Sequence, residues 1–273
     1  MRYKYLLLLI VPMVFFSCKK DKYPTPPPPP DPPVVPVLLK EIIIPNLPSP
    51  YYHFEYNTDG KAIFVSFASG DLMYDIVYVG GKISEMKNNT MGNKDRLQYF
   101  YDNAGRVDYI RYVDFNGFFY TRIFFTYDGP KLIKLEREMR SGAGFVLNKR
   151  LTMVYHADGN LKDLTEYRPP LSPQTEATYT YHFDEYDNKI NADAFSLLHD
   201  EMVDHLILLP GVQLQKNNPR KASLTGDGLN YQIDYSYTYN EKNQPLTKRG
   251  EVLITNGPKV GERFQTNSAY SYY

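Results

Sequence analysis

Apolar and polar residues alternate with a period of two along much of the chain from residue 51 onward. Successive side chains of a strand point to opposite faces of a sheet, so this alternation is typical of strands that bury one face. It predicts a chain composed largely of such strands. The clearest runs of alternating apolar positions are Tyr52, Phe54 and Tyr56; Ile63, Val65 and Phe67; Ile123, Phe125 and Tyr127; Leu151, Met153 and Tyr155; Tyr179, Tyr181 and Phe183; and Ile233, Tyr235, Tyr237 and Tyr239.

A short unit recurs between these runs. It has an aromatic strand end, a polar turn with Asp or Asn and usually Gly, and then a basic or polar residue followed by an aliphatic one. The sharpest copy runs from Tyr99 to Val107, and weaker copies begin at Tyr56, Tyr78, Tyr127, Tyr155, Phe183 and Tyr239. Gly and Asn adopt the positive φ that tight turns require, and Asp and Asn bond back to the turn backbone. The predicted turn residues are Asp59, Gly60, Asp102, Gly105, Asp128, Gly129, Asp158, Gly159, Asp187 and Asn188.

Seven such hairpins predict about fourteen strands or more, and an antiparallel sheet of that length must curl or close. We therefore expect an all-β fold, a long curved antiparallel meander that is an open or partly closed barrel-like sheet. One segment departs from the pattern, because residues 191–209 space their apolar side chains as a helix does, with Asp193 as a possible N-cap and Pro210-Gly211 as a stop. It predicts one amphipathic helix that packs on the sheet or plugs its open end. The helically spaced residues are Phe195, Leu198, Met202, Leu206 and Leu209.

The N-terminal residues predict an export signal. Arg2 and Lys4 precede an apolar run of about 11 residues, which is too short to span a bilayer. Residues 15–18, Phe-Phe-Ser-Cys, resemble a lipobox, and Cys18 is the only cysteine, which fits export with the thiol committed to lipid. The predicted organisation is a signal peptide at 1–17, a lipidated Cys18 with a Pro-rich linker at 18–37, and a single β domain at 38–273. A cleaved secretory protein with an incidental cysteine is the alternative.

The composition predicts an extended stalk after Cys18 and argues against two classes of protein. Nine prolines lie between Pro24 and Pro36, and an extended polyproline helix over residues 19–37 would reach roughly 60 Å from the lipid. The chain has 31 basic and 31 acidic side chains, and cleavage after residue 17 removes two cations and no acid, which leaves a formal charge of −2. This balance argues against a nucleic-acid binder and against a polybasic membrane-surface protein.

The sharpest copy of the unit carries the motif Tyr-x-Tyr-Asp-x-x-Gly-Arg-Val from Tyr99 to Val107 and resembles the YD repeat of the rearrangement-hotspot (RHS) wall proteins. Taken with the leader, the mature chain is similar to a family of Bacteroidetes lipoproteins of unknown function with a porin-like antiparallel sheet. Residues 186–189 and 235–240 add to this resemblance. It implies the fold and a lipid-anchored place in a Gram-negative outer membrane, with cell-surface exposure as one option. It implies no activity.

Catalytic and metal-binding chemistry finds little support. The tightest ionisable group comprises His199, Asp200, Glu201, Asp204 and His205. Glu201 and His205 lie four residues apart, but this pair lacks the second histidine of a zinc-protease helix, and we interpret the group as a solvated helix face. One carboxylate per turn is far from the six to eight oxygens that calcium takes. No nucleophile elbow, Walker loop or dinucleotide fingerprint is present. We therefore predict no catalytic residue, no metal site and no cofactor.

Three functions remain, and the 26 tyrosines bear on them. One-sided tyrosines either form the core of the sheet with hydroxyls at its rim, which we favour, or offer a platform for a ligand. The leading function is a lipid-anchored, non-catalytic binding or scaffold module, with the membrane, a glycan or an envelope protein as partners and no nucleic acid. The alternative is an envelope or surface hydrolase acting on a polymer, with its site on loops such as 139–149 or 168–178. An outer-membrane β-barrel is remote, because predicted outward positions such as Lys134 and Glu136 are charged.

Overall fold

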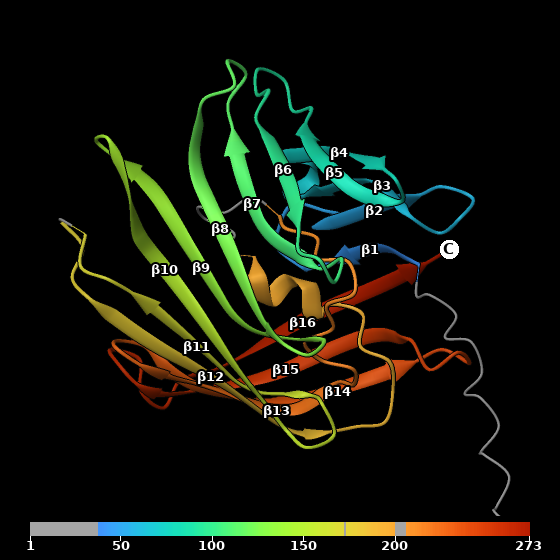
Figure 1. The fold of residues 1–273 in the computed structure, drawn as a ribbon. Helices are drawn as coiled ribbons and strands as arrows, with labels where there is room; N and C mark the ends of the chain where they lie inside the picture. Colours follow the sequence, from blue (N-terminus) through green and yellow to red (C-terminus); the bar gives the residue numbers. More distant parts are fainter. Residues whose placement is uncertain (1–37, 172, 200–205) are drawn as a thin grey trace, which may run out of the picture. The chain divides into compact units, whose positions relative to one another are not determined.

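The computed structural model describes residues 38–171, 173–199 and 206–273, so the leader, Cys18 and the linker lie outside the described residues. Sixteen strands form a closed antiparallel barrel in which each strand pairs with its neighbours in the chain and β1 pairs with β16 (Figure 1). The predicted all-β meander is confirmed, and the sheet is fully closed. The strands are β1 (Leu39–Ile43), β2 (Tyr52–Tyr56), β3 (Ala62–Phe67), β4 (Leu72–Val79), β5 (Lys82–Asn88), β6 (Arg96–Tyr101), β7 (Val107–Val113), β8 (Phe119–Asp128), β9 (Lys131–Ser141), β10 (Gly144–Tyr155), β11 (Leu161–Arg168), β12 (Ala177–Tyr186), β13 (Pro219–Gly226), β14 (Asn230–Tyr239), β15 (Pro245–Asn256) and β16 (Arg263–Tyr272).

Alternation along the strands directs apolar side chains into the barrel and polar ones outward. Ile110 of β7 and Leu135 of β9 are almost completely buried, whereas their neighbours Arg111 and Glu136 are partly exposed. A barrel of this many strands is too wide for its wall side chains alone to fill. An apolar lining of such a lumen therefore needs a further segment to pack against.

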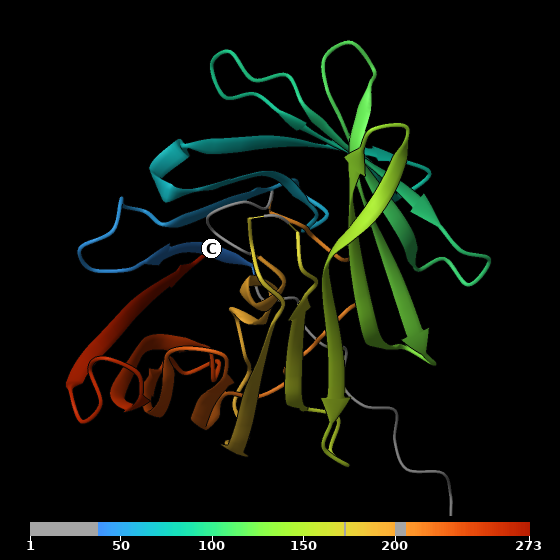
Figure 2. The same ribbon diagram turned by 90° about the vertical axis from the view of Figure 1, so that its left-hand side faces the viewer.

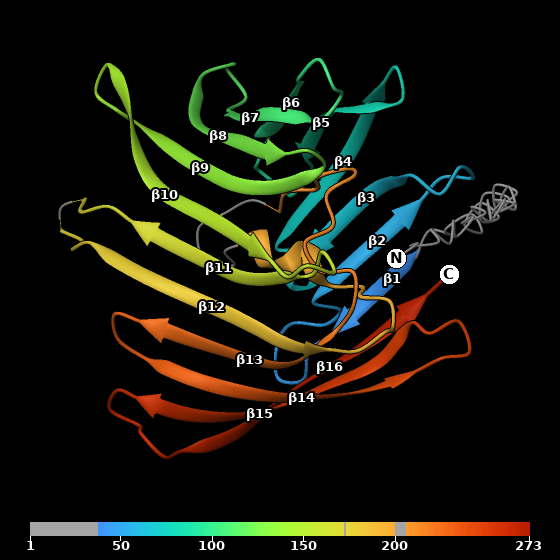
Figure 3. The same ribbon diagram turned by 60° about the horizontal axis from the view of Figure 1, so that its bottom comes forward.

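That segment is the connection between β12 and β13, residues 187–218, of which 200–205 lie outside the description; we call it the lumen segment. Its short 3₁₀ helix η2 (Ala194–Leu198) lies inside the ring of strands (Figures 2 and 3). Phe195 contacts Tyr52 and Phe54 edge-on, each at a centroid distance of 5.2 Å. Leu198, Leu206, Ile207 and Leu214 belong to the buried core together with wall residues. The described part of this segment thus occupies the lumen and packs against its wall.

The amphipathic helix predicted over 191–209 is wrong. Among residues 191–199 and 206–209, which the structure describes, only the five residues of η2 are helical, and residues 206–209 have no regular structure. The apolar side chains of this segment meet barrel wall around them, so their spacing reflects burial inside a lumen and not one face of a helix. His199 is only 9% exposed, so it does not belong to a solvated face; its Nδ1 lies 3.0 Å from the Tyr52 hydroxyl. Asp200, Glu201, Asp204 and His205 fall outside the described residues.

Several predicted turn residues lie at hairpin turns along one rim of the barrel. Gly105 has a φ of 83°, and the Asp102 carboxylate accepts hydrogen bonds from the Arg106 backbone at 2.9 Å and the Arg106 guanidinium at 2.8 Å. In the first copy Asn57, and not Asp59, accepts the bond from the turn backbone. The other predicted glycines at these turns also have positive φ: Gly60 (72°), Gly129 (55°) and Gly159 (89°).

The remaining predicted turn residues have different surroundings. Asp128 is the last residue of β8 and pairs with Lys131, and Asp158 accepts a bond from the Asn160 backbone at 2.9 Å. Asp187 and Asn188 do not form a hairpin turn, because they begin the lumen segment. Asp187 accepts a bond from the backbone N–H of Asn218, at the far end of that segment, at 3.1 Å.

Seven tyrosines near the ends of even-numbered strands, five of them within copies of the repeated unit, form a ring of hydrogen bonds at the same rim. Each donates its hydroxyl to a backbone carbonyl at the start of the preceding odd-numbered strand, at 2.6–3.0 Å. We call this ring the tyrosine rim. Burial, with a smaller contribution from neighbouring Tyr78, raises the pKa of Tyr101 to about 12, so its hydroxyl stays protonated and can donate. The pairs are Tyr78 with Ala62, Tyr101 with Ile83, Tyr127 with Val107, Tyr155 with Leu132, Tyr186 with Leu161, Tyr237 with Pro219 and Tyr272 with Pro245.

The basic residue of the unit also reaches its neighbour. In four consecutive units the cation lies over the ring of the next rim tyrosine, at 4.7–5.6 Å from the centroid, as cation–π pairs do. Each of these four hairpins is therefore tied to the next by a hydroxyl and by a cation, which gives the basic residue of the unit a structural role. The four pairs are Lys61 over Tyr78, Lys82 over Tyr101, Arg106 over Tyr127 and Lys131 over Tyr155.

Candidate ligand-binding face

The outer surface of β6 to β8 carries a row of aromatic rings. Ile110 and Ile123 of β7 and β8 point into the core, so Tyr109 and Phe124, one residue away along their strands, point outward. Tyr109 stacks on Phe100 of β6 with 4.3 Å between centroids and 9° between planes. Phe124 continues the row at 5.9 Å from Tyr109. All three rings are partly exposed.

A second stack lies beside the first, and two arginines occupy the space between them. Phe119 of β8 stacks on Phe145 of β10 at 5.2 Å with planes 8° apart. The Arg111 guanidinium carbon lies 4.8 Å from the Phe100 centroid and 5.2 Å from the Phe119 centroid. Arg122 bridges the stacks in the same way, at 5.2 Å from Phe124 and 4.3 Å from Phe145. We call this surface the aromatic–arginine face: Phe100, Tyr109, Arg111, Phe119, Arg122, Phe124 and Phe145.

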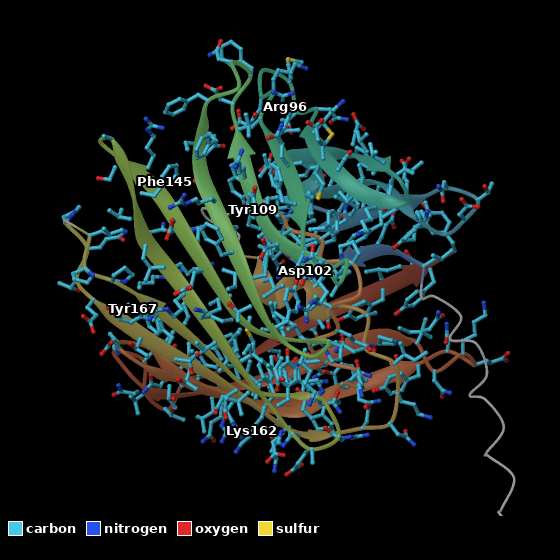
Figure 4. All side chains as sticks on the ribbon, viewed as in Figure 1. Arg96, Asp102, Tyr109, Phe145, Lys162 and Tyr167 are labelled. Carbon is cyan, nitrogen blue, oxygen red and sulfur yellow. The ribbon has the colours of Figure 1, made fainter. Side chains whose placement is uncertain are left out.

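The charge of this face is unbalanced at its centre. Arg111 and Arg122 are directly opposite each other in the β7–β8 ladder, an arrangement of like charges that destabilises a sheet. Arg122 has a counterion in Glu138. Arg111 donates to the Tyr109 hydroxyl at 3.4 Å, but within the described chain no carboxylate lies within ion-pair distance of it. Figure 4 shows the labelled Tyr109 and Phe145 on the side of the barrel formed by β6 to β10.

A second polar constellation lies inside the barrel and anchors the lumen segment. The Asp193 carboxylate is 3.0 Å from Nζ of Lys248 on β15 and accepts a bond from the Tyr270 hydroxyl on β16 at 2.7 Å. Burial alone would raise the pKa of Asp193, but Lys248, Tyr270 and Asn191 outweigh it and hold the pKa below its usual value. The group joins the segment to two wall strands and has a structural role.

A third constellation has the residue types of a hydrolase. The His182 Nδ1 lies 2.6 Å from the Asp163 carboxylate, and Ser223 is directly opposite His182 on β13. A catalytic triad requires the imidazole to hydrogen-bond the hydroxyl that it activates. Among the described side chains, His182 and Ser223 form no such bond. The arrangement is a histidine–aspartate hydrogen bond beside a serine on the outer surface.

In residues 38–171, 173–199 and 206–273, no group of three or more histidine, cysteine or acidic side chains is placed to hold a metal ion. None of the helices in the same part of the chain has the length and apolarity to cross a membrane.

The expectation that the tyrosines form the core of the sheet is right for those whose side chains point into the barrel and for those of the tyrosine rim. It missed the aromatic–arginine face. The signal was present in residues 107–113 and 119–128, where a bulky ring and an arginine flank the one buried isoleucine of each strand.

The barrel is similar to two solved structures of porin-like proteins. The structure from Bacteroides uniformis has a TM-score of 0.58 and 13% identity over 87% of this chain and 95% of that chain. The structure from Bacteroides vulgatus has a TM-score of 0.56 and 16% identity over 86% of this chain and 99% of that chain. No family model matches the sequence, and no curated protein matches it significantly. The similarity establishes a shared fold, and the YD-repeat assignment stays a prediction.

Proposed function

We propose that the chain is a lipid-anchored, non-catalytic binding module of the cell envelope, which holds an extended ligand on the aromatic–arginine face. One observation carries the proposal: two stacks of partly exposed rings with two guanidinium groups between them, on the outside of the barrel. Aromatic rings and arginine together offer apolar contact, cation–π contact and directed hydrogen bonds to a ligand.

The rest of the fold favours an outer site over an inner one. The lumen segment packs against the wall from inside, which leaves the outer surface as the larger accessible area. Closure of the sheet removes every free strand edge, so a ligand cannot bind by adding a strand. Recognition therefore has to use outward side chains.

The outward side chains also disfavour a barrel that spans a membrane. Such a barrel needs an apolar band on its lipid-facing side. The outward carboxylate of Glu136 on β9 forms ion pairs with Lys134 at 2.8 Å and with Arg150 of β10 at 2.7 Å. Arg122 of β8 forms an ion pair with Glu138 nearby. We propose instead that lipid on Cys18 provides the attachment. The porin-like proteins of similar fold support an envelope location.

Replacing Cys18 with serine is expected to abolish lipid attachment, because serine offers no thiol for the diacylglycerol. The measurement is incorporation of labelled palmitate into the full chain expressed in a Gram-negative host, followed by fractionation of membranes and soluble material. We expect no label and loss from the outer-membrane fraction. Undiminished label in Cys18→Ser would contradict the anchor.

Ligand binding is tested with the mature chain from residue 18 carrying Cys18→Ser, so that the linker is kept and the lipid is absent. Panels of envelope and surface glycans and of envelope proteins are screened, and the affinity of any hit is measured by calorimetry. Tyr109→Ala and Phe145→Ala are each expected to weaken binding about tenfold or more, as loss of a central aromatic contact does.

Phe264→Ala is the matched control, because Phe264 is a half-exposed ring on β16, outside the face. We expect its affinity to equal that of the parent. Equal affinities for Tyr109→Ala and the parent would contradict the site. Turnover of a polymer, abolished by His182→Ala, would replace the proposal with the hydrolase alternative.

A further inference from the structure

A groove of about 530 Å³ lies at the rim opposite the tyrosine rim, beside the aromatic–arginine face. It is formed by the outer sides of β4 to β6, the loop that joins β5 to β6, and a ring from the loop between β7 and β8. We call it the basic groove. Its lining residues are Asp75, Lys87, Asn88, Asn89, Lys94, Arg96 and Phe115.

Cations outnumber acids in this groove. Lys87, Lys94 and Arg96 line it together with a single carboxylate, Asp75, which already accepts a bond from Asn89 at 3.0 Å. Lys87 lies 3.7 Å from Glu85. Lys94 and Arg96 form neither an ion pair nor a side-chain hydrogen bond with any other described residue. Two cations are therefore available to an anion from outside.

Two buried donors without acceptors lie behind the lining of the groove. Arg96 is half-buried, and its Nε is inaccessible and has no hydrogen-bond partner. Asn88 is only 3% exposed; its Oδ1 accepts a bond from the Thr90 backbone at 2.9 Å, but its Nδ2 is unpartnered. Buried polar groups are ordinarily paired, and leaving one unpaired costs free energy. Both atoms are enclosed, so the groups that an anion in the groove can reach are the exposed Lys94 ammonium and the partly exposed remainder of the Arg96 side chain.

The groove and the aromatic–arginine face are continuous. Arg96 pairs with Lys87 on one side and with Val113 on the other. Arg111 is two residues before Val113, so it points to the same side of the sheet as Arg96. Figure 4 shows the labelled Arg96 and Tyr109 on this side of the barrel. A single extended ligand could contact unpaired cations at one end and stacked rings at the other.

We propose that the ligand is an acidic glycan whose carboxylate or phosphate oxygens bind in the basic groove while its sugar rings contact the aromatic–arginine face. This inference rests on the proposed binding function and adds the charge class of the ligand. A peptide that recognised the backbone would need a free strand edge, which the closed barrel lacks. Sugar rings present apolar faces to aromatic side chains, and acidic substituents pair with lysine and arginine.

The test compares two hexasaccharides with the mature Cys18→Ser chain, a galacturonan and its carboxyl-reduced, neutral counterpart. We expect the galacturonan to bind at least tenfold more tightly. Lys94→Gln and Arg96→Gln should each remove most of that difference, whereas Lys242→Gln, an exposed cation in the β14–β15 turn, should leave it unchanged. Melting temperatures show whether each variant is folded. Because Lys94 is exposed, Lys94→Gln still tests the inference if Arg96→Gln is unstable.

Additional measurements distinguish a phosphate from a carboxylate and separate failure of this inference from failure of the proposed function. Competition by inorganic phosphate stronger than by acetate would assign phosphate as the anionic group, and the reverse would assign a carboxylate. Equal affinity for the acidic and neutral sugars, with Tyr109→Ala still impaired, would overturn the inference and leave the proposed function standing. If neither sugar binds, the inference is overturned. If no member of the panel of glycans and envelope proteins binds, the proposed function is contradicted as well. Tighter binding of single-stranded DNA or of an envelope protein than of the galacturonan would overturn the glycan assignment.

Discussion

Asp193→Ala is expected to lower the free energy of unfolding by about 3–5 kcal/mol, the range for removing one partner of a buried ion pair. Asp193 and Lys248 are 3.0 Å apart, with side chains only 16% and 22% exposed. The substitution leaves the Lys248 ammonium inside the barrel without its anion, and the Tyr270 hydroxyl loses its acceptor. Denaturant unfolding of the mature chain gives the measurement.

The control is Asp234→Ala, an exposed carboxylate on β14, which should change stability by no more than about 0.5 kcal/mol. A loss for Asp193→Ala no larger than that of Asp234→Ala would show that the pair does not hold the lumen segment.

The same pair determines how stability depends on pH. The folded pKa of Asp193 lies below its unfolded value of about 3.9, so its stabilisation is present above that value and is lost as pH falls through the folded pKa. Burial alone would lower the pKa of Lys248, but the Asp193 carboxylate outweighs it and raises that pKa. The lysine contribution is therefore present below about pH 10.4 and is lost as pH rises through the folded pKa. Asp193→Asn has no carboxylate to protonate at this position, so its unfolding free energy should fall less than that of the parent as the pH is lowered through the acid range.

Phe54→Ala is expected to cost about 3–5 kcal/mol, as large-to-small substitutions of buried phenylalanine do. Phe54 is 4% exposed on the inner wall of β2, and its ring meets Phe195 of the lumen segment at 5.2 Å. The double variant with Phe195→Ala should then be less destabilised than the sum of the single variants, by about 0.5–1.5 kcal/mol for one aromatic pair.

Phe115→Ala is the control for Phe54→Ala, because Phe115 is 72% exposed and contributes little buried area. Its unfolding free energy should stay close to that of the parent. Strict additivity of Phe54→Ala and Phe195→Ala would contradict the contact between the lumen segment and the wall.

The strands and their faces follow from the sequence, because alternation with a period of two is a local property of each strand. Closure of the sheet does not. Leu39 pairs with Tyr272, and no local pattern reports a pairing between the two ends of the described chain. The spacing over residues 191–209 predicts a helix because a segment buried on several sides has apolar side chains at many spacings, including the helical one.

The candidate site was harder to predict than the fold, for a specific reason. Aromatic residues occur on both parities of β7 and β8, so Tyr109 and Tyr112 look alike in the sequence although Tyr112 is buried inside and Tyr109 is stacked outside. Only the register shows that Arg111 and Arg122 are neighbours. Whether Lys94 and Arg96 find acidic partners depends on how the loop between β5 and β6 folds, which no local pattern encodes.

The tyrosine rim suggests how a barrel of this kind could change size during evolution. Each rim hydrogen bond joins one hairpin to the hairpin before it and is independent of how many hairpins follow. Duplication of one unit within the gene would therefore carry its own attachment with it, as in repeat proteins whose units contact only their neighbours. A wider ring would enclose a larger lumen. Gain or loss of a hairpin is thus expected to accompany a change in the length of the lumen segment, so that unit number and insert length evolve together.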